Sequence, residues 1–358
     1  MPLPENSPSA RIANPHLYSP RMCRWRPFET VPGQVVLDQG SLLRVVSWNI
    51  DFMAAGRATR ASSAMDHLEG AFGNPPLPLV IMLQEVHCES LLAILGHPWI
   101  RKNFVLSDVS VPQPYFTLMM VSRHIQTQNW FRVPLQSRME RDILVVDIPI
   151  SHSGSESTSP KKILRLCTTH LESLWEREGE ELRPHQLAQI SALLKAPPTC
   201  VTQIIGGLVG GDMNHISPLD SASHKTGNVE LYDVWEDTAP PPIPPRKPFQ
   251  KDLTFGRAKA NTWGYQSPGA KSRKRLDKFF YTGSVDTIAL AEVQDLTGKI
   301  GRLGIGLKTK VKVWEDKTRL HLDKKSVLDG MYGSEAAYKE VDAWVSDHFG
   351  IAIGIRVH

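Results

Sequence analysis

The sequence lacks several features that mark specialised classes of protein. No apolar run approaches the roughly 20 residues needed to cross a bilayer, so we expect no membrane span. The first residues, MPLPENSPSARIANP, have no apolar core of a secretory signal, so we expect an intracellular protein, nuclear or cytoplasmic. The 4 cysteines are far apart, which argues against a disulfide framework and a cysteine-based zinc site. The net charge of +4 permits a polyanionic partner without demanding one.

The chain does contain enough apolar residues for a sizeable core. Of its 358 residues, 41% are hydrophobic and 22% are charged, which is typical of a globular protein. Residues 1–40 are rich in Pro, Ser and Arg without periodicity, and we predict a flexible leader there, with docking of Trp25 and Phe28 on the body as an alternative to a free tail. Residues 41–358 are expected to form one large domain, with a Pro-rich surface loop inserted near 239–248.

Strand-like and helix-like patterns are mixed along this domain. Helical periodicity covers residues 57–72 and 183–195, with Pro184 placed in a first turn. The polar segment 151–160 is predicted to be a hairpin loop. Apolar strand-like runs cover residues 42–50, 79–85, 115–122, 143–150, 163–170, 203–212, 275–282 and 349–357. Because strict alternation is missing, we predict an α+β fold of layered sheets flanked by helices instead of a doubly wound fold.

Polar residues follow these apolar runs repeatedly. Ionisable side chains are costly to bury unless they are paired or bind a metal. If the strand ends share one rim, carboxylates, amides and imidazoles meet there, and such oxygen ligands suit Mg²⁺ or Mn²⁺. The residues concerned are Asn49, Asp51, Gln84, Glu85, His170, Glu172, Asp212, Asn214, Asp347 and His348.

Each of these motifs is weak by itself. A QE or DxN pair usually marks a solvated strand end or turn. The RLD of residues 275–277 is commonly a surface ion pair, and Trp263 is more often a packed loop anchor than a substrate platform. The signal is the conjunction of all these motifs in a fixed order.

That conjunction resembles the endonuclease/exonuclease/phosphatase superfamily of metal-dependent phosphodiesterases, and within it the tyrosyl-DNA phosphodiesterase 2 family. The resemblance covers residues 42–358 and implies a four-layer α/β sandwich of two packed mixed β-sheets flanked by helices. The motifs that carry it are WNID (48–51), QEV (84–86), THLES (169–173), GDMN (211–214), DVWE (233–236), TW (262–263), RLDKFF (275–280) and SDH (346–348).

The resemblance implies a metal site. Glu85 corresponds to the principal Mg²⁺ ligand, with Asn49 beside it and Asp347 as an auxiliary carboxylate. Mn²⁺ is expected to substitute for Mg²⁺. Asp212 and Asn214 correspond to the pair that orients or deprotonates the attacking water.

The resemblance also implies groups that contact the substrate. His348 and His170 correspond to the histidines at the scissile phosphate, and Asp277 to the carboxylate that fixes the tautomer of His348. Thr262, Trp263 and Arg275 are implied at the substrate-binding groove.

The implied activity is Mg²⁺-dependent hydrolysis of 5′-tyrosyl-DNA phosphodiester bonds, which leaves 5′-phosphate ends for DNA repair. The expected partner is DNA with tyrosyl or other protein-linked ends, single-stranded if Trp263 stacks on a base. A protein-linked RNA end is an alternative, and we expect a monomer. The sequence departs from the family pattern at Gly264, at His215 and at Phe349, where the family usually has Asp, Leu and Trp.

Other functions remain open at this level. The chain fits another enzyme of the superfamily, such as an RNA deadenylase, an inositol-phosphate phosphatase or a general nuclease. A non-enzymatic scaffold that recruits partners through residues 239–248 is a further alternative, although it would not need the metal-site residues.

Overall fold

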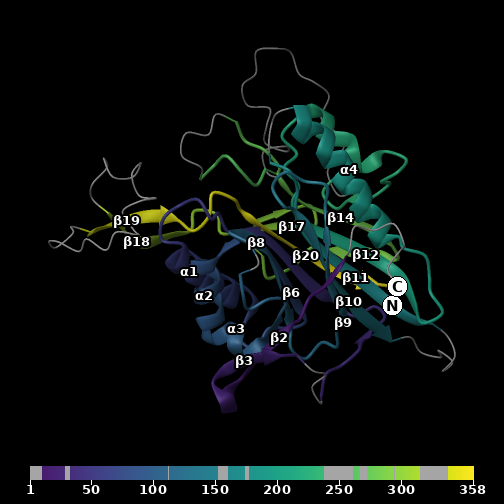
Figure 1. The fold of residues 1–358 in the computed structure, drawn as a ribbon, viewed down its shortest axis with the longest axis horizontal. Coiled ribbons are helices and arrows are strands. Elements are labelled where there is room, and N and C mark those ends of the chain that lie inside the picture. The colour runs from purple at the N-terminus through teal and green to yellow at the C-terminus, as the bar shows by residue number, and fades with distance from the viewer. Residues whose placement is uncertain are drawn as a thin grey trace.

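The computed structural model describes residues 10–28, 33–111, 113–151, 160–173, 177–237, 261–266, 272–293, 295–314 and 338–358. Among these residues two large mixed β-sheets pack face to face, and helices cover both outer faces (Figure 1). The predicted α+β fold, a four-layer sandwich, is thereby confirmed.

The first sheet has 10 strands in the order β16-β17-β20-β5-β6-β8-β7-β2-β3, and β15 also pairs with β20. Within it β5 and β6 run parallel, whereas β20 and β8 flank them in antiparallel orientation. Its strands are β2 (His16–Ser19), β3 (Arg24–Pro27), β5 (Leu43–Asn49), β6 (Leu79–His87), β7 (Phe104–Leu106), β8 (Tyr115–Ser122), β15 (Val285–Ile288), β16 (Asp295–Thr297), β17 (Ile300–Leu303) and β20 (Gly350–Val357).

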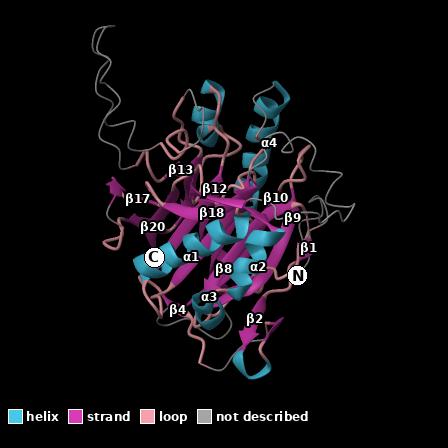
Figure 2. Cartoon of the chain, turned by 90° about the vertical axis from the view of Figure 1, so that its left-hand side faces the viewer, coloured by secondary structure: helices cyan, strands magenta, loops and turns pink. Residues whose placement is uncertain are grey.

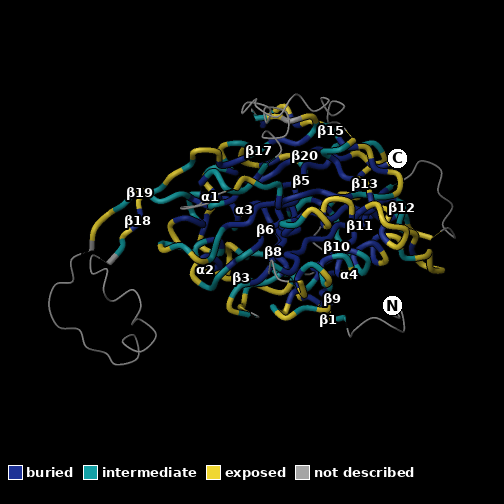
Figure 3. Tube along the Cα trace, turned by 90° about the horizontal axis from the view of Figure 1, so that it is seen from above, coloured by how far each residue is buried: buried dark blue, intermediate teal, exposed yellow. Residues whose placement is uncertain are grey.

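The second sheet has 8 strands in the order β1-β9-β10-β11-β12-β14-β13, and β4 also pairs with β10. Here β11 and β12 run parallel, as do β4 and β10, and β14 follows β12 in antiparallel orientation. Its strands are β1 (Arg11–Ile12), β4 (Leu37–Asp38), β9 (Gln128–Pro134), β10 (Asp142–Ser151), β11 (Lys161–His170), β12 (Thr202–Asp212), β13 (Tyr232–Asp233) and β14 (Asp277–Gly283). A separate ribbon of β18 (Lys308–Trp314) and β19 (Tyr338–Trp344) extends from the body (Figures 1 and 3).

The helices divide between the two outer faces (Figures 1 and 2). The first sheet is covered by α1 (Arg57–Phe72), α2 (Cys88–Gly96) and α3 (Pro98–Asn103). The second is covered by α4 (Arg177–Leu194). Two short 3₁₀ helices, η1 (Pro20–Met22) and η2 (Pro218–Lys225), complete the described helices.

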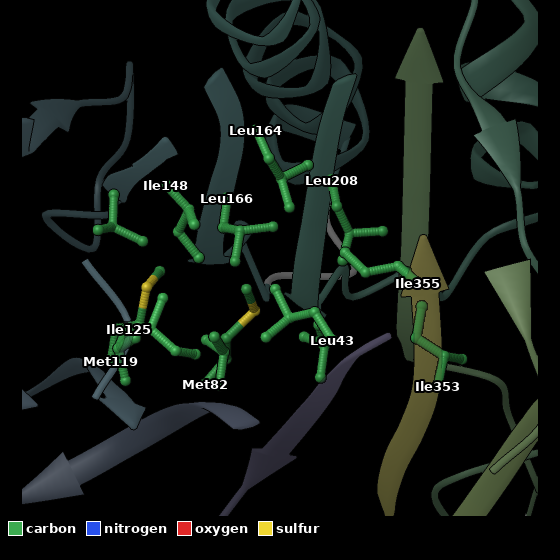
Figure 4. Packing of buried hydrophobic residues seen from close by; sticks show 14 of the residues in the cluster. Leu43, Met82, Met119, Ile125, Ile148, Leu164, Leu166, Leu208, Ile353 and Ile355 are labelled. Atoms are coloured by element: carbon green, nitrogen blue, oxygen red, sulfur yellow. The ribbon is translucent and has the colours of Figure 1, made fainter. Parts of the chain in front are cut away.

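The core lies between the sheets and under the helices (Figure 3). Strand β5 is buried along its whole length, and its alternating side chains serve two layers. Val45 points into the space between the sheets, while Val46 and Trp48 pack under the helices. Between the sheets, Met82 faces Leu166 and its neighbours (Figure 4). Each buried aliphatic side chain contributes roughly 1.5–3 kcal/mol.

Several predicted boundaries agree with the structure. The predicted helix 57–72 is α1, and the predicted strand 115–122 is β8, with the same ends. The prediction for Pro184 is wrong, because α4 begins at Arg177 and Pro184 lies inside the helix. Strands β10 and β11 form the expected antiparallel pair, while loop residues 152–159 and the Pro-rich segment 239–248 lie outside the described residues. No helix among the described residues has the length and apolar character to cross a membrane.

The predicted flexible leader differs from the structure over its described residues. Strand β1 pairs with β9, so it extends the second sheet. Strand β2 pairs with β7 and β3, so both extend the first sheet. Trp25 is half-buried and donates a hydrogen bond to the backbone oxygen of Leu95 (3.2 Å). The leader is ordered there because the sheet edges offer unpaired backbone groups to it.

Candidate active site

The parallel strand pairs of the two sheets bring the predicted polar residues to one rim. In the first sheet Asn49 ends β5 and lies opposite Gln84, the residue before Glu85 in the last part of β6. In the second, His170 lies opposite Asp212 at the ends of β11 and β12, and Asp277 opens β14 opposite Asp212. Because parallel strands end on the same side, both sheets present carboxyl ends to one opening between them.

Asn49 joins the two sheets at this rim. Its side-chain amide donates hydrogen bonds to Glu85 Oε1 (3.0 Å) and to Asp212 Oδ2 (3.0 Å), and its own oxygen accepts from the backbone of Asp51 (3.0 Å). As oriented, the amide therefore serves as a donor between two carboxylates. The predicted ligation of a metal by Asn49 requires this amide to turn over.

Glu85 reaches the rim through an irregular backbone. Leu83 and Val86 both pack under the helices, and the pairing of β6 with β8 shifts register between them. Glu85 has φ of 59°, the left-handed region that costs a non-glycine residue about 1–3 kcal/mol. This bulge turns the carboxylate toward Asn49, and the backbone N–H of Phe52 donates to Glu85 Oε2 (3.0 Å).

The carboxylates of the rim are crowded and buried. Burial raises the pKa of Asp212 to about 6, although the His348 charge acts in the opposite direction. Burial also raises the pKa of Glu85, and the charge of Asp347 adds to that rise. The pKa of Asp51 is raised by burial and by Asp347 as well. The rim thus concentrates negative charge in a region of low polarity, which favours a bound cation.

His348 is held as a cation by two carboxylates. Its Nδ1 lies 2.8 Å from Asp277 Oδ2, and its Nε2 lies 3.7 Å from Asp212 Oδ2. Burial alone would lower the pKa of His348, but the charges of Asp277 and Asp212 raise it well above its ordinary value. Since Nδ1–H is directed to Asp277, the Nε2–H points toward Asp212 and the opening.

His170 is neutral, in contrast to His348. Burial, followed by the charge of Arg141, holds the pKa of His170 well below its ordinary value. Arg141, which can only donate, places Nη1 3.1 Å from His170 Nδ1 and Nη2 3.4 Å from Nε2. The shorter contact makes Nδ1 the acceptor, and the carboxylate of Asp212 lies beside Nε2, so the proton of His170 is assigned to Nε2. That Nε2 lies 3.5 Å from Asp212 Oδ2 and 4.0 Å from Glu85 Oε1. These short distances are therefore contacts of a neutral donor, not ion pairs.

Two further predicted residues flank this centre. Asn214 has φ of 46°, and its backbone N–H donates to Asp212 Oδ1 (2.9 Å), while its side-chain amide donates to the backbone of Leu171 (3.0 Å). Asp347 Oδ2 accepts from the indole N–H of Trp263 (2.9 Å). The structure thus brings Asn214, Asp347 and Trp263 to the same rim.

Thr262 and Arg275 occupy supporting positions. The Thr262 hydroxyl is buried and accepts from the backbone N–H groups of Leu276 (3.2 Å) and Asp277 (3.1 Å). Arg275 donates to both carboxylate oxygens of Asp233 (2.9 and 2.7 Å). The predicted substrate contact by Arg275 is not what this geometry shows, because its two terminal nitrogens are engaged with Asp233.

Sequence reasoning missed Arg60, which braces the loop beside the site. Its side chain is 1% exposed and donates to the backbone oxygens of Ile50 (3.1 Å), Asp51 (2.9 Å), Ala54 (3.1 Å) and Trp344 (2.9 Å). It also pairs with the Asp51 carboxylate (2.9 Å). The available signal was an arginine on the apolar side of a helix, where burial demands partners.

Sequence reasoning also missed Arg141, for which no motif exists. Its guanidinium lies 5.2 Å from the ring centroid of Tyr115, and Tyr115 stacks on Phe52 (4.1 Å between centroids). Glu85, Tyr115, Arg141 and His170 line one pocket. The site therefore continues from the carboxylates into a cavity with an aromatic wall and a cation.

The donor set fits a hard divalent cation. Glu85, His170 and Asp212 each place one ligand atom within 4.8 Å of the others. Asp212, Asp277 and His348 are grouped as closely, but His348 is there a cation paired with Asp277 and offers no lone pair to a metal. The oxygens are carboxylates, and none of the 4 cysteines is among these residues. Asp277 also leaves a buried carboxylate oxygen, Oδ1, without a hydrogen-bond partner. Such oxygens suit Mg²⁺ or Mn²⁺ better than Zn²⁺.

Comparison with known proteins identifies the fold. No family model matches the sequence, and no curated protein matches it. Among solved structures, TDP2 of D. rerio, in complex with a single-stranded DNA product, is 18% identical, with a TM-score of 0.53 over 88% of this chain and 100% of that chain. Truncated TDP2 of Caenorhabditis elegans is 18% identical, with a TM-score of 0.53 over 89% of this chain and 99% of that chain.

An endonuclease/exonuclease/phosphatase family protein from Bacteroides thetaiotaomicron is also similar. It is 13% identical, with a TM-score of 0.51 over 89% of this chain and 99% of that chain. These likenesses agree with the layered sheets described above. The chain therefore has the fold of the endonuclease/exonuclease/phosphatase superfamily, which it shares with TDP2.

Proposed function

We propose that this chain is a divalent-metal-dependent phosphodiesterase that hydrolyses 5′-tyrosyl-DNA bonds and leaves a 5′ phosphate. The observation that carries the proposal is the meeting of Glu85, Asp212, His170 and His348 at one rim. Glu85 and His170 also line a pocket together with Tyr115 and Arg141. The D. rerio protein of the same fold, in complex with a single-stranded DNA product, supports DNA as the substrate class.

Asp212 is the candidate base for the attacking water. A carboxyl with a pKa of about 6 is largely ionised at neutral pH and is basic enough to accept a proton. Asn49 and the backbone of Asn214 each donate to one of its oxygens, which fixes the orientation of the carboxylate. The water oxygen forms a bond to phosphorus while the bond from phosphorus to the phenol oxygen breaks.

The two histidines offer donors for the non-bridging phosphate oxygens. His348 provides the Nε2–H of an imidazolium, and His170 provides the Nε2–H of a neutral imidazole. Donors fixed before the reaction stabilise charge that develops on those oxygens. Asp277 and Arg141 act through the histidines as positioning residues.

Glu85 and Asp347, with Asn49 if its amide turns over, are the residues that would hold the metal ion. When bound, Mg²⁺ supplies positive charge that neutralises phosphoryl oxygens, and Mn²⁺ is expected to replace it. A tyrosine phenol has a pKa near 10, so it leaves more readily than a sugar hydroxyl and needs no strong general acid.

An end-specific cleavage assay tests the proposal. Single strands with a 5′-tyrosyl end are compared with 3′-tyrosyl ends, poly(A) RNA and inositol phosphates, with and without a chelator. Cleavage of the 5′-tyrosyl end, abolished by the chelator, is the expected result. Preference for any of the other substrates would assign the site to a different activity of the superfamily, and no turnover with bound metal would favour a scaffold.

A further inference from the structure

The basic run KSRKR (271–275) leads into β14 beside the candidate active site, and its described members make different contacts. Arg275 is engaged with Asp233, and Lys274 donates its ammonium to the backbone oxygen of Ile216 (3.1 Å). Arg273 is exposed and makes no ion pair with any residue that the structure describes. Arg273 therefore differs from its neighbours in having its N–H groups available to a ligand.

Arg273 is nevertheless held in place. Its guanidinium lies 4.4 Å from the ring centroid of Tyr265. Tyr265 stacks in turn on Phe349 (5.2 Å between centroids, 28° between planes), which is buried and directly follows His348. A guanidinium on an aromatic face keeps the donors at its edges free, so stacking orients the cation without consuming its hydrogen bonds.

The backbone places this stack next to the reacting end of the site. Trp263 forms an antiparallel bridge with Lys274, the neighbour of Arg273, and another with His348. Gly264 has φ of 93°, and a Cβ there would lie 2.3 Å from the backbone oxygen of Ser272. Only glycine permits this close approach of the two backbone segments. Gly264, where the sequence departs from the family pattern, thus lets the segment that carries Tyr265 lie close to the segment that carries Arg273.

We infer that Arg273 binds a backbone phosphate of single-stranded DNA next to the scissile bond, and that Tyr265 fixes its position. This inference rests on the proposed function for its choice of DNA. Arginine is suited to the role because its planar fork matches phosphate oxygens and is always charged. The inference replaces the predicted substrate contact of Arg275, whose charge Asp233 already neutralises.

Binding of a short single strand with a 5′ phosphate tests the inference without requiring turnover. Fluorescence anisotropy of the full chain with Mg²⁺ would be recorded between about 50 and 200 mM salt. The variants are Arg273→Gln and, as a matched control, Arg24→Gln. Arg24 is an exposed arginine on the edge strand β3, so its loss changes net charge by the same amount.

The expected result is a roughly tenfold weaker affinity for Arg273→Gln at the lower salt concentration, equivalent to one charged contact. The slope of log affinity against log salt should become shallower by about 0.7, the value for one phosphate of a single strand. Arg24→Gln should match the wild type. The inference is overturned if Arg273→Gln matches the wild type, if both variants lose affinity equally, or if the wild type does not bind the strand.

The two proposals can fail separately. A wild type that binds with an Arg273-dependent slope but does not cleave 5′-tyrosyl ends would remove the proposed function and leave the phosphate contact. If the wild type cleaves these ends, and Arg273→Gln has the same slope of log affinity against log salt as the wild type, the proposed function stands and the phosphate contact of Arg273 is removed.

Discussion

The pair of His348 and Asp277 provides a prediction that can be worked out from the geometry. Their side chains are 6% and 0% exposed, and 2.8 Å separates Nδ1 of His348 from Oδ2 of Asp277. Asp277→Asn keeps an oxygen near Nδ1 but removes the charge. Burial then opposes protonation of His348 without the charge of Asp277, which is the largest of the charges that act against it, so the pKa of His348 should fall.

Loss of the imidazolium should lower the rate near neutral pH. Removing one preorganised donor commonly costs about 100- to 1,000-fold in kcat, and we expect Asp277→Asn to fall in this range. The alkaline limb of the pH–rate profile should move to lower pH, since His348 loses its proton earlier. Asp277→Asn should also lose up to about 3–5 kcal/mol of unfolding free energy, as expected for breaking a buried ion pair.

The stability difference should depend on pH in a defined direction. The folded-state pKa of His348 lies above its ordinary value of 6.5, so the pair stabilises the wild type fully below pH 6.5. This advantage is lost as pH rises through the folded-state pKa. NMR titration of His348, chemical denaturation and the pH–rate profile check these points. An unchanged profile with full activity in Asp277→Asn would refute the reasoning.

Three further predictions concern other contacts. Arg141→Met removes a cation beside His170, so the pKa of His170, followed by NMR titration, should rise. The same variant should lower kcat/KM roughly tenfold. An unchanged pKa of His170 would contradict the contact with Arg141. Lys278 is buried, and burial lowers its pKa from 10.5 to about 7, so the unfolded chain binds more protons between these values. From pH 7 to 10 the unfolding free energy of the wild type should therefore rise relative to that of Lys278→Met, by up to about 1.4 kcal/mol per pH unit. If chemical denaturation gave the same difference between the two proteins at every pH, the lowered pKa of Lys278 would be contradicted. Arg60→Met leaves four backbone oxygens without their hydrogen-bond donor, so it should lower the unfolding free energy by several kcal/mol in chemical denaturation. A loss below about 1 kcal/mol would show that Arg60 does not stabilise this loop.

The long elements were predictable because their patterns are local. The helix 57–72 and the strand 115–122 have their predicted ends, since periodicity over many residues determines them. The strands of residues 11–27 are only 2 to 4 residues long and are ordered by the sheet edges that they join, which no local pattern reveals. The start of α4 was missed for a related reason, because Pro184 suggested a first turn that the structure places further upstream.

The site was partly predictable because strand ends bring distant motifs together. Asn49, Glu85, His170, Asp212 and His348 meet as the order of their motifs suggested. The hydrogen-bond partners of side chains that meet only through tertiary packing were not predictable.

Arg275 and Asp233 are an example of such packing, because they are 42 residues apart and their pairing decides that Arg275 is not free for substrate. The contact between Arg141 and His170 likewise depends on neighbouring strands. Motifs therefore identified the carboxylates and histidines, whereas the structure was needed to assign the arginines.

The most direct test of the central claim is the initial rate of 5′-tyrosyl single-strand cleavage as Mg²⁺ is titrated. Wild type is compared with Glu85→Gln and with Asp66→Asn, whose exposed carboxylate pairs with His97 in a different cluster of acidic residues and histidine. We predict saturable dependence on Mg²⁺ for the wild type and for Asp66→Asn, and a loss of at least roughly 100-fold for Glu85→Gln. Glu85→Gln with wild-type turnover and the same Mg²⁺ dependence would contradict a metal-assisted centre at this rim.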